Sequence, residues 1–178
     1  MIPASGQDPS PGRSSSPEPW LRGPVPEVPA LLQPVAHALV HAVEDVTRTV
    51  TALEAATVWR RPGGAASVGF HVRHAGGSLD RLFTYARGEA LSAAQLAALR
   101  AEAEPGEPPE DGAALVAAFQ ARVEAALAQL RATTDAELLV PRGVGRRQLP
   151  STTLGLLFHA AEHTQRHVGQ IVTTVRVL

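Results

Sequence analysis

Apolar residues recur every three or four positions along four long stretches of the chain, which is the spacing of amphipathic helices. The stretches span about residues 29–56 and 67–87, a third that begins at Asp111 or Gly112 and ends at Ala132, and a fourth that begins at Ser151 or Thr152 and runs nearly to Leu178. The first carries the apolar stripe Leu31, Val35, Leu39, Ala42, Val46, Val50 and Leu53. Segments that contain proline or glycine separate the stretches, so the chain can turn between one predicted helix and the next. This pattern predicts an all-α fold, a four-helix bundle.

Local signals mark where further elements begin and end. Ser67 is placed to cap the second helix. Ser92 and Gln95 have the spacing of a capping box and predict a short extra helix over residues 92–103. The stretch 102–111 is acidic and holds three prolines, which predicts a solvated loop.

Two other regions do not have the helical period. Residues 138–150 hold Pro141, Gly143 and Gly145 among alternating apolar residues, which predicts an extended segment or a loose hairpin. Eight of the 15 prolines lie at or before Pro29, mixed with serine and glycine. Such a stretch buries too little apolar surface to offset its ordering entropy. We therefore predict a disordered Pro/Ser-rich tail over residues 1–27 and one folded domain over residues 28–178.

Composition narrows the chemistry. The absence of cysteine excludes disulfides, thiolate nucleophiles and iron–sulfur clusters, so any metal must be held by nitrogen or oxygen ligands. A net charge of −1 argues against a generic nucleic-acid binder. No apolar run reaches the roughly 18 residues that span a bilayer, and the N-terminus lacks a signal-peptide layout. We expect a cytoplasmic protein with no nucleic-acid or membrane partner.

Two of the predicted helices carry a His-x3-His pair, the spacing at which two imidazoles share one helix face. On the first helix, His37 and His41 lie opposite the apolar stripe together with Glu44 and Arg48. That placement predicts solvent-facing residues without a specific metal.

The pair on the last helix lies beside its apolar stripe. Taking His163 as the origin, His159, His167 and Gln170 fall within about 40° of it on the helical wheel. A matching polar stripe occurs on the second helix, where Ser78, Arg81 and Tyr85 fall within about 40° of His74, and His71 lies near the edge of the stripe at about 60°. Facing stripes of this kind build metal sites inside helix bundles.

The chemical hypothesis is a divalent metal held by His74, His163 and His167. Three imidazoles leave an open position for water or substrate, and Zn, Ni, Fe and Mn all accept nitrogen ligands. The alternative is a polar network in which buried histidines only satisfy one another. The residues expected to line the pocket are Ser78, Arg81, Tyr85 and Gln170, although Arg81 and Tyr85 also fit ordinary hydrogen-bonding roles at the edge of the core.

Two motifs contain these histidines. Residues 67–74 read Ser-Val-Gly-Phe-His-Val-Arg-His and continue through Ser78, Asp80, Arg81 and Leu82, and residues 159–170 read His-Ala-Ala-Glu-His-Thr-Gln-Arg-His-Val-Gly-Gln. On these motifs the chain resembles the DinB/YfiT-like superfamily of bacterial proteins, over about residues 29–178. His163, His167, Gly169 and Gln170 match the family's second motif position by position. Val168 stands where the family usually has arginine.

The resemblance implies a four-helix bundle in which His74, His163 and His167 bind a divalent metal. His71 competes for the role of His74, and His159 competes for a place in the later pair. Some members of the family are thiol-dependent transferases or isomerases that use low-molecular-weight bacterial thiols, and members are often dimers.

Two functions follow. The first is a metal-dependent enzyme, a thiol transferase or hydrolase, that acts on a small electrophilic substrate. The second is a non-catalytic, stress-associated bundle that binds metal. Arg142, Arg146 and Arg147 are placed to meet an anionic thiol cofactor or to form a solvated face. A homodimer is expected from the family.

Overall fold

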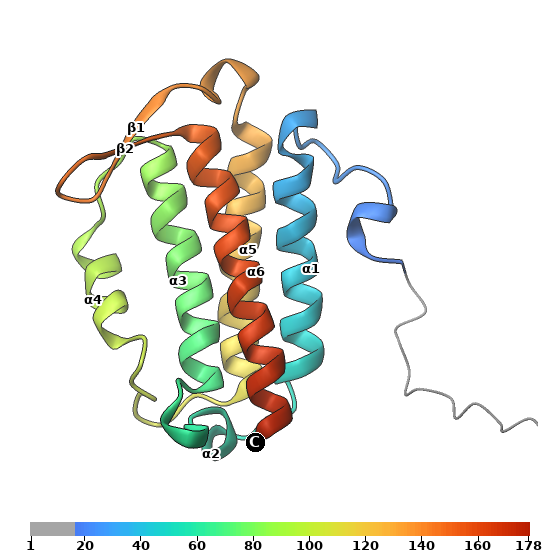
Figure 1. Cartoon of the computed structure of the whole chain (residues 1–178), viewed down its shortest axis with the longest axis vertical. Coiled ribbons are helices and arrows are strands. Elements are labelled where there is room, and N and C mark those ends of the chain that lie inside the picture. Colours follow the sequence, from blue (N-terminus) through green and yellow to red (C-terminus); the bar gives the residue numbers. More distant parts are fainter. Residues whose placement is uncertain (1–16) are drawn as a thin grey trace, which may run out of the picture.

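The computed structural model describes residues 17–178, which form a bundle of four long helices (Figure 1). These helices are α1 (Gln33–Val50), α3 (Val68–Ala86), α5 (Gly112–Ala132) and α6 (Thr153–Val177). Helices α1 and α3 each pack against both α5 and α6. The predicted all-α four-helix bundle is confirmed. Residues 1–16 of the predicted tail lie outside the described residues.

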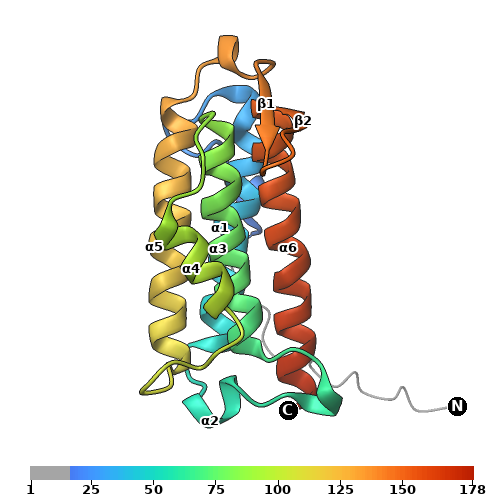
Figure 2. The same cartoon turned by 90° about the vertical axis from the view of Figure 1, so that its left-hand side faces the viewer.

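The connections between the long helices differ in length. α1 leads to α3 through the single turn α2 (Ala55–Val58) at one end of the bundle. α3 and α5 run in the same direction, so the chain has to return along the bundle between them, and α4 (Ala93–Ala101) lies on that return beside α3 (Figure 2). The strands β1 (Pro141–Val144) and β2 (Leu149–Thr152) form an antiparallel hairpin before α6, as the alternating pattern predicts.

Side chains cap the helices where the sequence predicts. The Ser67 hydroxyl accepts a hydrogen bond from the Phe70 amide at 3.1 Å and so caps α3. Ser92 and Gln95 form the reciprocal capping box of α4. Four 3-10 turns, at Pro19–Leu21, Ala30–Leu32, Pro62–Gly64 and Asp135–Glu137, complete the described elements.

The core lies between the four long helices and is made of leucine, valine and alanine. Its largest fully buried side chains include Leu39, Leu79, Phe119, Leu130 and Ile171. The expected stripe of the first helix is correct from Val35 to Val50, where α1 ends, but Leu31 is exposed and Leu53 lies beyond the helix and is only partly buried. Its neighbour Leu32 is buried instead, because residues 30–32 form a 3-10 turn, which rotates side chains differently from an α-helix.

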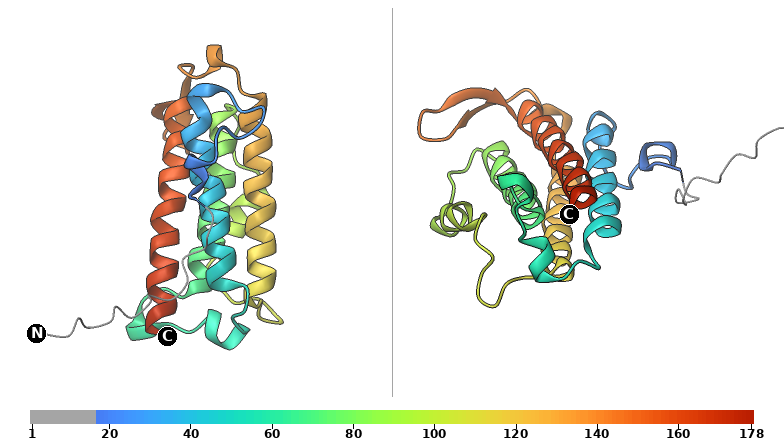
Figure 3. Two further views of the ribbon diagram at one scale, coloured as in Figure 1. Left: turned by 90° about the vertical axis from the view of Figure 1, so that its right-hand side faces the viewer. Right: turned by 60° about the horizontal axis from the view of Figure 1, so that its bottom comes forward.

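Part of the predicted tail is structured. Residues 17–28 lie along α1 (Figure 3, left). The Gln33 side chain holds them by accepting from the Val25 amide at 2.7 Å and donating to the Val25 carbonyl at 2.9 Å. Arg22 pairs with Glu44 of α1 through two nitrogen–oxygen contacts. The sequence does not predict the order of this segment, because polar contacts rather than a helical period of apolar residues hold it in place.

Among residues 17–178, one helix is long and apolar enough to cross a membrane by length and composition alone, namely α5. Its apolar side chains Leu115, Phe119, Val123 and Leu130 are buried against α1 and α3. The apolar face of α5 therefore packs inside the bundle.

Candidate metal centre

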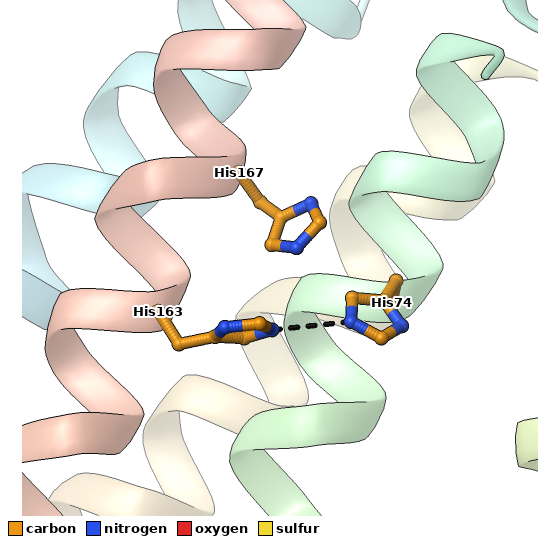
Figure 4. A group of neighbouring side chains, drawn as sticks. All are labelled: His74, His163 and His167. Atoms are coloured by element: carbon orange, nitrogen blue, oxygen red, sulfur yellow. Dashed lines mark hydrogen bonds between the residues drawn. The ribbon is translucent and has the colours of Figure 1, made fainter. Parts of the chain in front are cut away.

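Three histidines from two helices meet at the seam between α3 and α6. His74 projects from α3, and His163 and His167 project from successive turns of α6 (Figure 4). Each offers a ring nitrogen, and these three nitrogens lie within 4.8 Å of one another. His74 Nε2 and His163 Nε2 are 3.1 Å apart and share a hydrogen bond. The structure thus brings together the three histidines that the two sequence stripes single out.

A buried carboxylate orients the imidazole of His74. His74 Nδ1 lies 2.7 Å from Glu102 Oε2, and Glu102 is only 5% exposed. An imidazole that donates from Nδ1 to a carboxylate presents the lone pair of Nε2 on its other side. Glu102 therefore fixes the tautomer of His74 and turns its Nε2 towards the histidines of α6.

Glu102 is held in turn by Arg81, whose Nη1 donates to Glu102 Oε1 at 2.6 Å. The close approach requires glycine at position 77, because a Cβ there would lie 2.5 Å from Glu102 Oε1 and 2.8 Å from Arg81 Nη1. Helix α4 brings Glu102 to this place, since the side chain of Gln95 donates to Thr84 Oγ1 at 2.8 Å and so ties α4 to α3. The short helix is thus a support for one carboxylate.

A second histidine contact lies behind the cluster. His71 Nδ1 and His167 Nδ1 are 3.1 Å apart, and both side chains are buried. One of these nitrogens donates to the other, so each ring has its Nε2 side free of this bond. His71 therefore lies next to the cluster as a hydrogen-bonding partner of His167 and is not one of the three that converge.

Burial favours the neutral imidazole at His163, His167 and their neighbour His71. It lowers the pKa of His167 to about 4, and the neighbouring imidazoles act in the same direction. It also lowers the pKa of His71 and of His163, with the charge of His74 as the next cause for each. Because metals bind the neutral form, these histidines are in the state that coordination requires at neutral pH.

The carboxylate next to the cluster remains charged. Burial alone raises the pKa of Glu102, but the hydrogen bonds from His74 and Arg81 outweigh that effect and hold the pKa below its usual range. A negative charge beside His74 favours a cation at Nε2 of that ring. The cluster is therefore a set of nitrogen donors that fits a divalent transition metal.

One side of the cluster faces solvent. The side chain of His74 is 23% exposed, and that of His163 is partly exposed, whereas His167 is buried. Phe70 covers the face of the His74 ring, with ring centroids 5.3 Å apart and planes at 17°. A small molecule can thus approach the cluster from the side of His74 and His163.

The residues expected to line a pocket occupy different places. Ser78 donates to the Ala75 carbonyl of its own helix at 3.2 Å, and Arg81 is engaged by Glu102. Tyr85 lines a separate cavity near the hairpin, and Gln170 is exposed. His159 is 52% exposed and pairs with Glu162 rather than with the three histidines. Of this set, Arg81 reaches the cluster through Glu102, and the ring of His159 lies 5.7 Å from that of His163 between centroids.

The expectation that residues 102–111 form a solvated loop is wrong for Glu102. The loop is also anchored, because Arg73 donates to the carbonyls of Ala101, Glu104 and Pro105 and pairs with Glu110. Nothing in the acidic stretch distinguishes Glu102 from Glu104. The available signal was Arg81, a charged residue on an inward-facing stripe that needs an acidic partner when buried.

Within residues 17–178, the His-x3-His pair on α1 belongs to no group of three converging ligands. His37 Nε2 contacts the Gly23 carbonyl at 2.9 Å, and His41 lies 3.6 Å from Asp45 of the same helix. Both side chains are partly exposed. This placement agrees with the helical wheel, which put the pair opposite the apolar stripe.

The protein is thus a four-helix bundle with a candidate metal centre, made of three imidazoles and a supporting carboxylate, between two of its helices. The chain belongs to the DinB superfamily, whose family model matches residues 13–171. It is similar to the crystal structure of a conserved protein from Enterococcus faecalis, with 19% identity and a TM-score of 0.62, over 82% of this chain and 95% of that chain. At that identity the likeness shows the fold alone. No curated protein matches the chain.

Proposed function

We propose that the chain is a metal-dependent enzyme in which His74, His163 and His167 hold one divalent transition metal. The observation that carries the proposal is the convergence of three imidazole nitrogens within 4.8 Å, from two helices. Zinc, nickel, iron and manganese are all candidates, because each accepts imidazole ligands. A bound ion of this kind lowers the pKa of a coordinated water or thiol and so supplies a nucleophile near neutral pH.

The chain's own residues prepare the site. Glu102 accepts from His74 Nδ1 and keeps Nε2 as the donor atom, and Arg81 keeps Glu102 in place. Phe70 packs on the His74 ring and limits its rotation. His74 and His163 are partly exposed, so a substrate would approach from their side of the cluster. Preorganisation of this kind is what distinguishes a reactive site from an accidental group of ligands.

The reaction we propose joins a low-molecular-weight thiol to a small electrophile. The thiol sulfur forms a bond to the electrophilic carbon, the leaving group departs with the bonding electrons, and the thiol proton passes to solvent. The thiol must be brought by a cofactor or substrate, because the chain has no cysteine. Hydrolysis uses the same site with water in place of the thiol. A cytoplasmic location and a homodimer are further expectations that accompany this proposal.

The test is metal content followed by turnover. We expect about one metal ion per chain by elemental analysis after gentle purification, and close to none in His163→Ala. His159→Ala is the matched control, because His159 lies on the same helix but outside the cluster, and it should keep the metal. Metal-loaded protein is then assayed for thiol-dependent consumption of monochlorobimane with a panel of low-molecular-weight thiols.

The outcomes separate the functions. Metal with thiol-dependent turnover supports the enzyme. Metal without turnover of any electrophile favours a non-catalytic metal-binding bundle. Wild-type protein that retains no metal, or that retains as much as His163→Ala, contradicts both.

A further inference from the structure

A second concave region lies at the far end of α3, between the β1–β2 hairpin and the segment that joins α3 to α4. Its volume is about 570 Å³, within the range of small-molecule sites. The hairpin and α4 project to the same side of the bundle there (Figures 1 and 3). Tyr85, which lines the cavity, follows His74 by about three turns, or about 16 Å along the helix axis. The cavity is therefore separate from the histidine cluster.

Positive charge is concentrated in this cavity. Arg142 lines it and is fixed in place, since its Nε donates to the Ala86 carbonyl at 2.7 Å and its Nη1 donates to the Pro141 carbonyl at 3.3 Å. Arg146 also lines it, from the exposed turn of the hairpin, and has no acidic partner among residues 17–178.

The acidic groups nearby are already paired. Glu89 lines the cavity, but its Oε2 accepts from Arg87 at 2.7 Å and 2.9 Å. Glu137 is close enough to Arg142 for that charge to lower its pKa weakly, but its carboxylate accepts chiefly from Thr134. The field in the cavity is therefore set by the two arginines.

Part of the remaining lining is apolar, beside the polar side chains of Glu89 and Gln148. The apolar part includes Ala90, Leu91, Leu96 and Pro141, and the half-buried ring of Tyr85. An apolar wall beside a few fixed polar groups is the usual composition of a small-molecule site, in which the wall binds the body of the ligand and the polar groups orient it. Gly88 has φ of +80°, a backbone conformation that favours glycine, and lies against the side chain of Arg142.

From these observations we propose that the cavity binds a small organic carboxylate, with its apolar body against Leu91 and Leu96 and its carboxylate towards Arg142 and Arg146. The proposal does not rest on the metal site and holds if the three histidines bind nothing. It requires only the cavity, its charge and its apolar wall.

The experiment is an amide NMR titration of the full chain with benzoate, and with benzylamine as a probe of similar shape and opposite charge. We expect benzoate to shift the amides of Gly88, Gly143 and Gly145, and benzylamine to leave them unchanged. Arg146→Ala should weaken benzoate binding by about two- to fivefold, the range for an exposed charge pair. Arg147→Ala is the matched control, because Arg147 is adjacent and exposed but does not line the cavity.

Further variants locate the site. Leu91→Trp fills the apolar part and should abolish the shifts, whereas His163→Ala should bind benzoate as the wild type does. The proposal is overturned if benzylamine binds as well as benzoate, if Arg147→Ala weakens binding as much as Arg146→Ala, or if benzoate shifts none of the three glycine amides.

Discussion

The chain carries the same His-x3-His spacing on two helices, and the two pairs have different surroundings. His163 and His167 on α6 meet His74 from a second helix, with three nitrogens within 4.8 Å. His37 and His41 on α1 contact a backbone carbonyl and an aspartate of their own helix. The spacing supplies two donors in both places, so it does not by itself make a metal site.

What distinguishes the α6 pair is the set of groups that surround it. A facing helix provides a third imidazole, Glu102 orients that imidazole, and His71 contacts His167. The α1 pair lies on a partly exposed face, where one imidazole contacts the Gly23 carbonyl and the other lies beside Asp45. A site of three imidazoles therefore depends on the partner helix and on buried hydrogen bonds, and the predictions below remove these in turn.

The largest effect should come from the converging ligands. His163→Ala and His167→Ala should each lower metal affinity by more than 100-fold, because removing a ligand costs more than removing a supporting hydrogen bond, which costs about 10- to 100-fold. Competition with a chromophoric chelator measures the affinity. An affinity within tenfold of the wild type in either variant would show that the α6 pair is not the ligand set.

The second-largest loss of metal affinity is expected when the supporting carboxylate of Glu102 is removed. Glu102→Gln should lower metal affinity by about 10- to 100-fold, because the amide holds the His74 tautomer less firmly than a carboxylate does. Glu104→Gln, an exposed acid two residues further on, is the control and should bind metal normally. Equal affinities for the two variants would remove Glu102 from the account.

Glu102 also has a stability role that can be measured without metal. Glu102→Ala leaves the guanidinium of Arg81 buried without its carboxylate, which costs about 3 to 5 kcal/mol of unfolding free energy. Chemical denaturation of the metal-free protein measures this loss. A loss below about 1 kcal/mol would mean that solvent replaces the carboxylate, and the pair would then be too open to fix His74.

A smaller change in metal affinity is expected at His71, the other histidine on the inward side of α3. His71→Ala should keep one metal ion per chain, with affinity reduced by about tenfold through the lost contact to His167. His74→Ala should lose the metal. The reverse result would assign the α3 ligand to His71.

Acid should destabilise the metal-free protein through the same cluster. The pKa of His167 is about 4 in the folded state and about 6.5 when unfolded, so the unfolded chain binds more protons between these values. Stability is therefore present above about pH 6.5 and is lost as the pH falls towards 4. His167→Gln should flatten this dependence, and the exposed His159→Gln should not. Identical pH profiles for these two variants would contradict the burial of His167.

The smallest effect is expected on α1. His37→Ala and His41→Ala should leave metal content and affinity unchanged, because neither residue belongs to the cluster. A loss of metal in either variant, measured by elemental analysis, would show that the metal site involves α1. The distinction between the two histidine pairs would then fail.

Much of this architecture follows from local signals. The apolar period predicts the four long helices, Ser67 marks the start of α3, and Ser92 marks the start of the short helix α4. The helical wheel correctly separates the two histidine pairs, because it depends only on which face a helix buries. The position of Glu102 could not be obtained in this way. It depends on how α4 packs on α3 and on the space that Gly77 leaves for the carboxylate. Both are properties of the tertiary packing, which the apolar period of each helix does not contain.

The central claim is that one metal ion is held by His74, His163 and His167. X-ray absorption spectroscopy of zinc-loaded protein tests it most directly, because it counts the ligand types around the ion. The account predicts three imidazole nitrogens at about 2.0 to 2.1 Å, with any further ligand an oxygen from water, and a spectrum unchanged in His41→Ala. A first shell made only of oxygen atoms, or one with fewer than three imidazoles, would contradict it.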